Sequence, residues 1–271
     1  VTYWLENLTQ KVMNSDSALE IGTNVSRDKV YTSKAQYESE RHTLGRVERL
    51  AANTTAFELD YINTLKTIDR FEKQENFKLQ EKKPELTFKY SDEQRAAIED
   101  LIAPGQLKIL KGRAGTGKST VLKPVVAALQ AEGYDVKGMA FMGKVSEAME
   151  NDLGIESRTI DSYRVSWKKH AKAQETLQSG RFLSEKVRKE TLKELAYTSK
   201  DQITSKSVVV IDEGSLVGHK HFELILSKVE EVGAKVVVVK DDAQIKTLFG
   251  ADISEAMDRF VEGKSLTNVQ R

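Results

Sequence analysis

The chain has 271 residues, of which 39% are hydrophobic and 31% are charged, and its formal net charge is +1. This length allows one large α/β domain with a smaller one beside it. The near-neutral charge excludes a uniformly basic nucleic-acid binder, so a surface for nucleic acid must be local. There is no cysteine, which excludes disulfides, thiolate catalysis and cysteine-based zinc sites.

No stretch approaches the roughly 18 apolar residues of a membrane span, and the N-terminus lacks the pattern of a signal peptide. We therefore expect no membrane partner and a cytoplasmic location. The chain begins at Val1 rather than Met and stops directly after the motif-like segment Leu266-Thr-Asn-Val-Gln-Arg271. We expect it to be a fragment of a larger protein.

Residues 1–83 are predicted to form a small, mostly helical N-terminal domain or linker region. Amphipathic patterns predict helices over Ala35–Leu50 and Thr55–Lys73, and a short strand-like piece covers Lys29–Thr32. Such helices are more typical of packing elements than of DNA-binding elements, and both roles stay open here. The polar stretch that ends at Lys82-Lys-Pro84 is the best linker.

The second domain is predicted over residues 84–271 and opens with an amphipathic helix, Arg95–Ile102. Ser91 stands at the N-cap position of this helix and Gln94 at the capping-box position. Pro104-Gly105 ends the helix.

Residues 112–119 then read Gly-Arg-Ala-Gly-Thr-Gly-Lys-Ser, a complete phosphate-binding loop. A strand-like run, Leu107–Lys111, precedes the loop, and a segment with helical spacing, Thr120–Leu129, follows it. These flanks argue against a chance glycine-rich turn, because they aim backbone N–H groups and a helix N-terminus at a polyphosphate. Lys118 is expected to reach the β- and γ-phosphates, and Ser119 to bind Mg²⁺. The residues expected to line the nucleotide are Gly112, Arg113, Ala114, Gly115, Thr116, Gly117, Lys118, Ser119 and Thr120.

Strands and helices alternate after the loop. The predicted strands are Asp135–Phe141, Ser207–Glu213 and Ala234–Lys240, and the predicted helices are Lys144–Asn151, His221–Val232 and Ile253–Val261. The last two strands are continuous β-branched runs, as buried parallel strands require. This alternation predicts an α/β fold with a parallel sheet covered on both faces, and the architecture is RecA-like.

The alternation breaks between about residues 164 and 206, where Lys and Arg outnumber Asp and Glu in a pattern of charged helices. This segment is predicted to be a basic helical insertion. It is either a solvated helical excursion or a local basic surface for nucleic-acid phosphates, with Trp167 as a base-stacking platform. His219 and His221, two residues apart on a predicted helix, are expected to be solvated.

Besides the phosphate-binding loop (P-loop), an enzyme of this kind needs an acidic group at the end of another strand. Asp212 and Glu213 follow the apolar run that starts at Val208. Asp212 is expected to join Ser119 in holding Mg²⁺, and Glu213 to act as the base on the attacking water. Gln244, shortly after the next strand, could face the γ-phosphate, although such residues are common in loops. An ordinary charged turn is the alternative for the acidic pair.

In order and spacing, these motifs resemble those of superfamily 1 DNA helicases, and specifically the helicase part of conjugative transfer relaxases of the Ti-plasmid TraA type. The resemblance covers nearly the whole chain. The segments that carry it most specifically are Val30–Glu40, Tyr90–Ile98, Gly143–Met149, Gly154–Thr159 and Val210–Gly218.

The resemblance implies roles for particular residues. Gln94 would hydrogen-bond the adenine, which makes ATP the expected nucleotide together with Mg²⁺. Lys144 and Thr159 would lie near a single-stranded DNA track or the nucleotide cleft, and Arg271 would sense the γ-phosphate. The implied catalytic residues are Lys118, Asp212, Glu213, Gln244 and Arg271.

The resemblance further implies an ATP-dependent helicase that moves 5′ to 3′ and acts in conjugative DNA transfer. This chain would be its first motor domain. The implied partners are single-stranded DNA, a second RecA-like motor domain and a relaxase domain, the last two lying outside this chain. We therefore expect ATP binding but slow hydrolysis and no unwinding by this chain alone.

The chain departs from the family pattern at three positions. Lys240 replaces a Gly, which suggests a changed backbone angle or contact, Thr247 replaces a Pro, and Gly214 replaces an Ala. These departures bear on the coupling between ATP and DNA more than on ATP binding. The alternative function is a catalytically impaired remnant, or a DNA-binding or interaction module, that retains nucleotide binding. A small-molecule kinase is disfavoured, because Gln94 and the late Asp241/Gln244 pair have no role there.

Overall fold

The computed structural model describes residues 11–24, 26–179, 183–241 and 253–268. Among these residues, a six-stranded sheet forms the centre, with the strand order β5-β4-β6-β7-β3-β8. Every pairing in it is parallel, which confirms the predicted α/β class. Its strands are β3 (Leu107–Gly112), β4 (Asp135–Ala140), β5 (Ser157–Thr159), β6 (Ser207–Asp212), β7 (Lys235–Lys240) and β8 (Lys264–Leu266).

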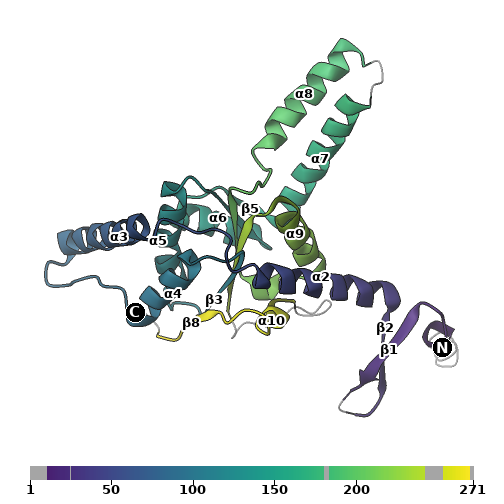
Figure 1. Ribbon diagram of the computed structural model, residues 1–271, viewed down its shortest axis with the longest axis horizontal. Helices are drawn as coiled ribbons and strands as arrows, with labels where there is room; N and C mark the ends of the chain where they lie inside the picture. Colours follow the sequence, from purple (N-terminus) through teal and green to yellow (C-terminus); the bar gives the residue numbers. More distant parts are fainter. Residues whose placement is uncertain (1–10, 25, 180–182, 242–252, 269–271) are drawn as a thin grey trace.

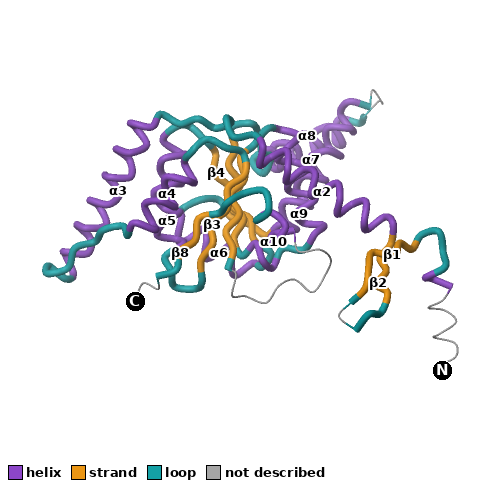
Figure 2. The backbone as a smooth tube through the Cα atoms, turned by 60° about the horizontal axis from the view of Figure 1, so that its bottom comes forward, coloured by secondary structure: helices purple, strands orange, loops and turns teal. Residues whose placement is uncertain are grey.

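Helices cover both faces of this sheet (Figure 2). One face carries α4 (Asp92–Ile102), α5 (Lys118–Ala131) and α6 (Gly143–Leu153), and the other carries α2 (Lys34–Ala52), α7 (Ile160–Gln178), α9 (His219–Val232) and α10 (Ile253–Met257). Alternate residues of a strand point to opposite faces. Each face has its own cluster of buried apolar residues. In β6, accordingly, Val208 and Val210 pack into the cluster on the face of α4, α5 and α6, and Val209 and Ile211 pack into the cluster on the other face. Burial on both sides explains why the strand sequences are continuously apolar.

The N-terminal region packs onto both layers of this domain. Val47 and Leu50 of α2 belong to the apolar cluster around α9, and Arg49 pairs with Glu230 of α9 at 2.6 Å. Ile68 of α3 (Tyr61–Lys82) belongs to the other cluster. Ahead of α2, β1 (Ala18–Thr23) and β2 (Lys29–Ser33) form an antiparallel hairpin. The division of the chain between residues 83 and 84 stays a prediction.

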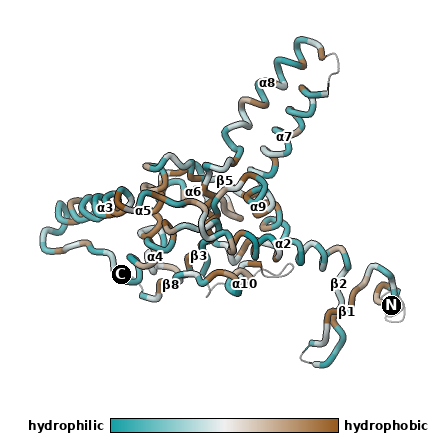
Figure 3. The backbone as a smooth tube through the Cα atoms, in the orientation of Figure 1, coloured by the Kyte–Doolittle hydropathy of each residue, from teal (hydrophilic) through white to brown (hydrophobic). Residues whose placement is uncertain are grey.

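The charged helices predicted within residues 164–206 are α7 and α8 (Glu185–Ser199). They form a hairpin that projects from the body of the molecule (Figure 1). Hydrophilic residues dominate the projecting part, whereas the hydrophobic residues concentrate in the sheet and in α5 (Figure 3).

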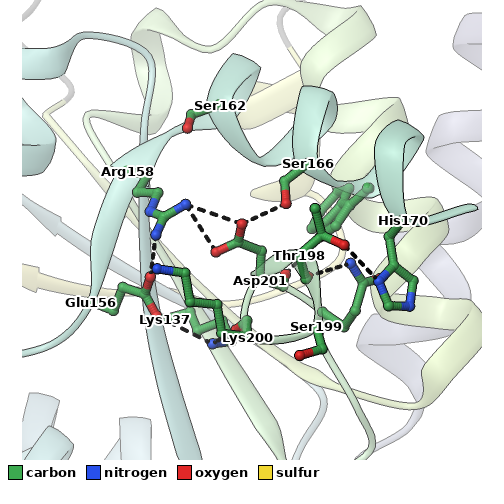
Figure 4. A network of polar contacts seen from close by, with 12 residues as sticks. Lys137, Glu156, Arg158, Ser162, Ser166, His170, Thr198, Ser199, Lys200 and Asp201 are labelled. Atoms are coloured by element: carbon green, nitrogen blue, oxygen red, sulfur yellow. Dashed lines mark hydrogen bonds and ion pairs between the residues drawn. The ribbon is translucent and has the colours of Figure 1, made fainter. Parts of the chain in front are cut away.

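A buried polar network ties the base of this hairpin to the edge of the sheet (Figure 4). Asp201, which follows α8, is fully buried, and Nη1 of Arg158 on β5 lies 3.0 Å from each of its carboxylate oxygens. The Ser166 hydroxyl of α7 donates to the same carboxylate. Lys137 of β4 donates its Nζ–H to the Lys200 carbonyl oxygen at 2.7 Å. A buried carboxylate is stable only with such partners, so the hairpin is fixed where it leaves the domain.

Trp167 is part of this base and is 8% exposed. Its indole N–H donates to the Asp201 carbonyl oxygen at 2.7 Å, and its ring packs at 5.9 Å from that of Tyr163. The hypothesis of a base-stacking platform at Trp167 is therefore wrong, because the ring has no free face for a base.

Further expectations need correction. The helix predicted over Thr55–Lys73 spans Tyr61–Lys82 instead, so the polar stretch before Lys83, predicted as a linker, is helical. His219 is buried rather than solvated, with its Nε2 at 3.1 Å from the Thr43 hydroxyl of α2. The last predicted helix ends at Met257 rather than Val261. The strands β1, β5 and β8 were not predicted, and β5 and β8 have only three residues each, too few to show a periodicity. Among the described residues, no helix is long and apolar enough to cross a membrane.

The burial of Lys235, at the start of β7, leads to a prediction about the pH dependence of stability. The residue is fully buried, its Nζ donates to the Ala103 carbonyl oxygen, and burial lowers its pKa to about 7. The pKa of an unfolded lysine is about 10.4. Between these two values the unfolded chain binds more protons, so the free energy of unfolding should rise with pH by roughly 1 kcal/mol per pH unit.

Urea unfolding at a series of pH values between about 7.5 and 9.5 measures this slope. Lys235→Met keeps a long apolar side chain and removes the titrating amine, so its slope should be flatter. The variant should also be more stable than the parent at pH 7.5. Equal slopes for the two proteins would contradict the assignment.

Candidate nucleotide-binding site

The phosphate-binding loop joins the end of β3 to the start of α5, as predicted. Gly115 and Gly117 have φ values of +80° and +85°, a region that side chains disfavour. A Cβ on Gly112 would lie 2.6 Å from the Thr116 Oγ1, so the chain can turn this tightly only with glycine there. Gly117 supplies no side-chain cap to α5. The first N–H groups of that helix can therefore bind an anion.

Lys118 lies folded against the loop. Its Nζ donates to the Gly112 carbonyl oxygen at 2.7 Å and to that of Arg113 at 3.2 Å. The Thr116 hydroxyl also donates to the Arg113 carbonyl, at 2.9 Å. The ammonium group is thus held at the mouth of the loop by weak neutral acceptors, which phosphate oxygens can replace with stronger charge-assisted bonds.

Asp212 ends β6 and faces this loop. Burial raises the pKa of Asp212, while the N–H of Glu213, 2.8 Å from Oδ1, and the positive charge of Lys118 lower it. The negative charge of Asp152, on α6, raises the pKa again. The carboxylate therefore lies within electrostatic reach of the P-loop lysine, and a cation placed between them and the phosphates would favour its ionised form.

Glu213 adopts a left-handed backbone with φ of +49°. This conformation costs a non-glycine residue about 1 kcal/mol, and it turns the chain out of β6 into a short 3₁₀ helix, η1 (Gly214–Leu216). Strain of this kind concentrates at functional sites. The next residue is packed closely, since a Cβ on Gly214 would lie 2.7 Å from Val238 Cγ1. Glycine in place of the family's alanine therefore suits this packing.

Lys240 does not have the positive φ that a glycine position would suggest. Its side chain is buried instead, and Nζ donates to the Ser254 carbonyl oxygen at 3.0 Å and to the Asp258 carboxylate. Asp258 also pairs with Lys111 of β3 at 2.9 Å. The lysine thus ties β7 to the region of α10 through a charge-assisted contact.

Gln94 is buried in the first turn of α4. Its Oε1 accepts from the Ser91 N–H at 3.1 Å, and the Ser91 hydroxyl accepts from the Gln94 N–H at 3.2 Å, which confirms the predicted capping box. The neighbouring Glu93 accepts from Thr267. Because Leu266, one residue earlier, pairs with Gly112 in the sheet, α4 begins close to the P-loop. Contact between Gln94 and adenine stays a prediction.

Two predicted catalytic residues, Gln244 and Arg271, lie outside the described residues, as does Thr247. Their roles stay predictions.

Comparison with known families identifies this arrangement. The sequence pattern of a family described as "AAA domain" matches residues 89–271. The chain belongs to this AAA domain family.

The similar curated proteins are named for conjugal transfer. "Conjugal transfer protein TraA" of Agrobacterium fabrum (strain C58 / ATCC 33970) is 32% identical over 170 residues, which are 62% of this chain and 13% of that protein. A protein of the same name from Rhizobium radiobacter is 31% identical over 170 residues, with the same coverage of 62% and 13%. The predicted resemblance is thereby confirmed, but the matched residues are 62% of the chain rather than nearly all of it. The chain spans about an eighth of the length of these relatives.

Among solved structures, the Pif1 helicase from Candida albicans is similar, with a TM-score of 0.43 and 20% identity. The match covers 68% of this chain and 41% of that one.

A second surface of the AAA domain follows the ends of β4 and β5. Lys144 is exposed at the start of α6, and Thr159 caps α7 by accepting from the Ser162 N–H. A Cβ on Gly143 would lie 3.9 Å from Thr159 Cγ2. The two strand ends thus bring the predicted DNA-track residues into one region. Phe141, 47% exposed, belongs to it.

A groove of about 580 Å³ lies beside this region, between α2, α7 and α9. The ring of His221, on its wall, lies 5.7 Å from that of Phe141. Basic residues outnumber acidic ones in the lining, which includes Arg46, Arg164, Lys168 and Lys220 against Asp161 and Glu223. We call the groove together with Phe141 and Lys144 the basic face. The sequence analysis missed Arg46 and Lys220, because only the fold brings α2 and α9 beside α7.

The close approach at Gly112 generates a prediction. Gly112→Ala should weaken ATP binding by at least about tenfold, or 1.4 kcal/mol, because the new Cβ displaces Thr116 from the loop. Titration with a fluorescent ATP analogue measures the affinity. Gly218→Ala is the matched control, since a Cβ there meets nothing within 4 Å. Equal affinity of the Gly112 variant and the parent would contradict the geometry.

Proposed function

We propose that this chain is the ATP-binding and ATP-hydrolysing first motor domain of a DNA helicase that acts in conjugative DNA transfer. One observation carries the proposal. The P-loop after β3 and the Asp212-Glu213 pair after β6 meet at one edge of the sheet, with Lys118 close enough to lower the pKa of Asp212. The similarity to proteins named for conjugal transfer supports the biological context.

The oxygen donors at this edge fit magnesium, which prefers hydroxyl, carboxylate and phosphate oxygens. The Ser119 hydroxyl and the Asp212 carboxylate would hold it. When bound, Mg²⁺ neutralises phosphate charge and so favours attack on the γ-phosphorus.

The chain's own groups perform the remaining tasks. Lys118 exchanges its two carbonyl contacts for the β- and γ-phosphate oxygens and neutralises their charge. The N-terminus of α5 binds the phosphates through backbone N–H groups. Glu213, directly after Asp212, accepts the proton of the attacking water. Gln94 contributes the expected contact to adenine.

Hydrolysis in such motors is completed by a second RecA-like domain, so we expect slow turnover by this chain alone. The alternative function is an impaired remnant or interaction module that binds nucleotide without turnover. The altered third motif, with Lys240 and Thr247, favours it.

Two substitutions test the assignment of the nucleotide site. Lys118→Ala should abolish ATP binding, because it removes the phosphate-binding cation. Glu213→Gln should keep ATP affinity within about twofold and lower turnover by roughly 10²-fold or more, because only the base is lost. The measurements are binding of a fluorescent ATP analogue and phosphate release with and without single-stranded DNA.

Unchanged turnover in the Glu213 variant would rule out this residue as the base. ATP binding by the parent with no turnover, even after addition of the second motor domain of a related helicase, would favour the remnant.

We further propose that the basic face binds single-stranded DNA. Lys168 and Lys220 offer phosphate contacts, and the exposed ring of Phe141 offers a stacking surface for a base. Arg46 and Arg164 pair with Glu230 and Asp161. The face begins where β4 ends, and α6, which starts there, reaches the nucleotide site through Asp152.

The salt dependence of DNA binding tests this face. Each phosphate contact with single-stranded DNA contributes about 0.7 to the slope of log affinity against log salt. The double variant Lys168→Ala/Lys220→Ala should therefore lower the slope by about 1.4. Fluorescence anisotropy with a labelled oligonucleotide measures it. Lys186→Ala/Lys189→Ala, on exposed α8, is the control with equal charge loss, and an equal effect there would rule out the specific face.

A further inference from the structure

The hydroxyl of Ser119 has an unexpected partner. Ser119 Oγ donates to Asp152 Oδ2 at 3.2 Å. Asp152 lies in the last turn of α6, between the segments Gly143–Met149 and Gly154–Thr159 but in neither, and its side chain is exposed. Two helices on the same face of the sheet, α5 and α6, are thereby joined at the candidate metal site.

The direction of this hydrogen bond matters for the metal. A hydroxyl has one hydrogen and two acceptor lone pairs. When the oxygen binds a cation it uses a lone pair, so its hydrogen must point to another acceptor. An acceptor that holds the hydrogen to one side leaves the lone pairs of Ser119 free for Mg²⁺. Such outer partners orient metal ligands and commonly contribute 10- to 100-fold to metal affinity, as an order of magnitude.

The charges around Asp152 also bear on the candidate metal site. A carboxylate is unfavourable at the negative C-terminal end of a helix, and the last turn of α6 carries no basic residue. Lys123 and Asp152 line the same cavity. Lys78 also lines it, but its charge is paired with Glu75 at 2.8 Å. Asp152 and Asp212 are two negative charges that repel each other at this site. A divalent cation beside Ser119 and Asp212 would relieve this repulsion.

We propose that Asp152 is a positioning residue for magnesium, which accepts the Ser119 hydrogen and thereby directs the serine oxygen toward the metal. The proposal rests on the proposed nucleotide site and adds a residue to it. Asp152 acts through Ser119 and through the charge of the site, without contact to the reacting atoms.

The test is the Mg²⁺ dependence of nucleotide binding by the 271-residue chain. A fluorescent ATP analogue is titrated at increasing Mg²⁺ concentrations and, separately, in EDTA. Asp152→Ala should raise the Mg²⁺ concentration for half-maximal binding by about tenfold. In EDTA its affinity should be no weaker than that of the parent, because the carboxylate repels phosphate. Asp152→Asn, which keeps an acceptor oxygen, should shift the midpoint less than Asp152→Ala.

Glu150→Ala is the matched control, because it removes an equal charge from an exposed position on the same helix. Its Mg²⁺ midpoint should equal that of the parent. The proposal is overturned if Asp152→Ala leaves the midpoint unchanged, or if Glu150→Ala shifts it equally. If the parent binds no nucleotide at all, the proposed function fails and this inference fails with it. Thermal unfolding of each variant separates these outcomes from loss of fold.

Discussion

Alternate residues of β6 and β7 pack into two separate apolar clusters, one on each face of the sheet. This double burial requires cover on both sides of the sheet and is typical of parallel strands, which all the pairings in this sheet are. The carboxyl ends of β3, β4, β6 and β7 therefore meet at one edge, and ligand sites in such sheets form there. The P-loop, Asp212 and the start of the basic face all lie at this edge because their strands end there.

The features that sequence alone predicted are local ones. The P-loop is a contiguous motif, and the central strands can be recognised by unbroken runs of apolar residues such as Val208–Ile211. What escaped prediction depends on contacts between distant segments. Trp167 is buried because Asp201, after the next helix, closes over it. His219 is buried because α2 lies across α9, and Asp152 reaches Ser119 only through the packing of α6 beside α5.

The departures from the family pattern become intelligible in three dimensions. At Gly214 the backbone passes so close to Val238 that a methyl group would collide with it. At Lys240 the charge is matched by Asp258, which holds Lys111 as well. A buried ion pair of this kind contributes less net stability than its contacts suggest, because desolvation offsets the attraction. It nevertheless fixes β3, β7 and α10 in one arrangement beside the nucleotide site.

The α7–α8 hairpin is held at its base by Arg158, Ser166 and Lys137, which bond to Asp201 and Lys200. A joint made of several buried polar contacts resists bending, because loss of one contact leaves a buried charge unpaired. The base of the hairpin is consequently fixed to the sheet rather than flexibly joined to it. A force applied near its tip would therefore be transmitted to β4 through Lys137 and to β5 through Arg158.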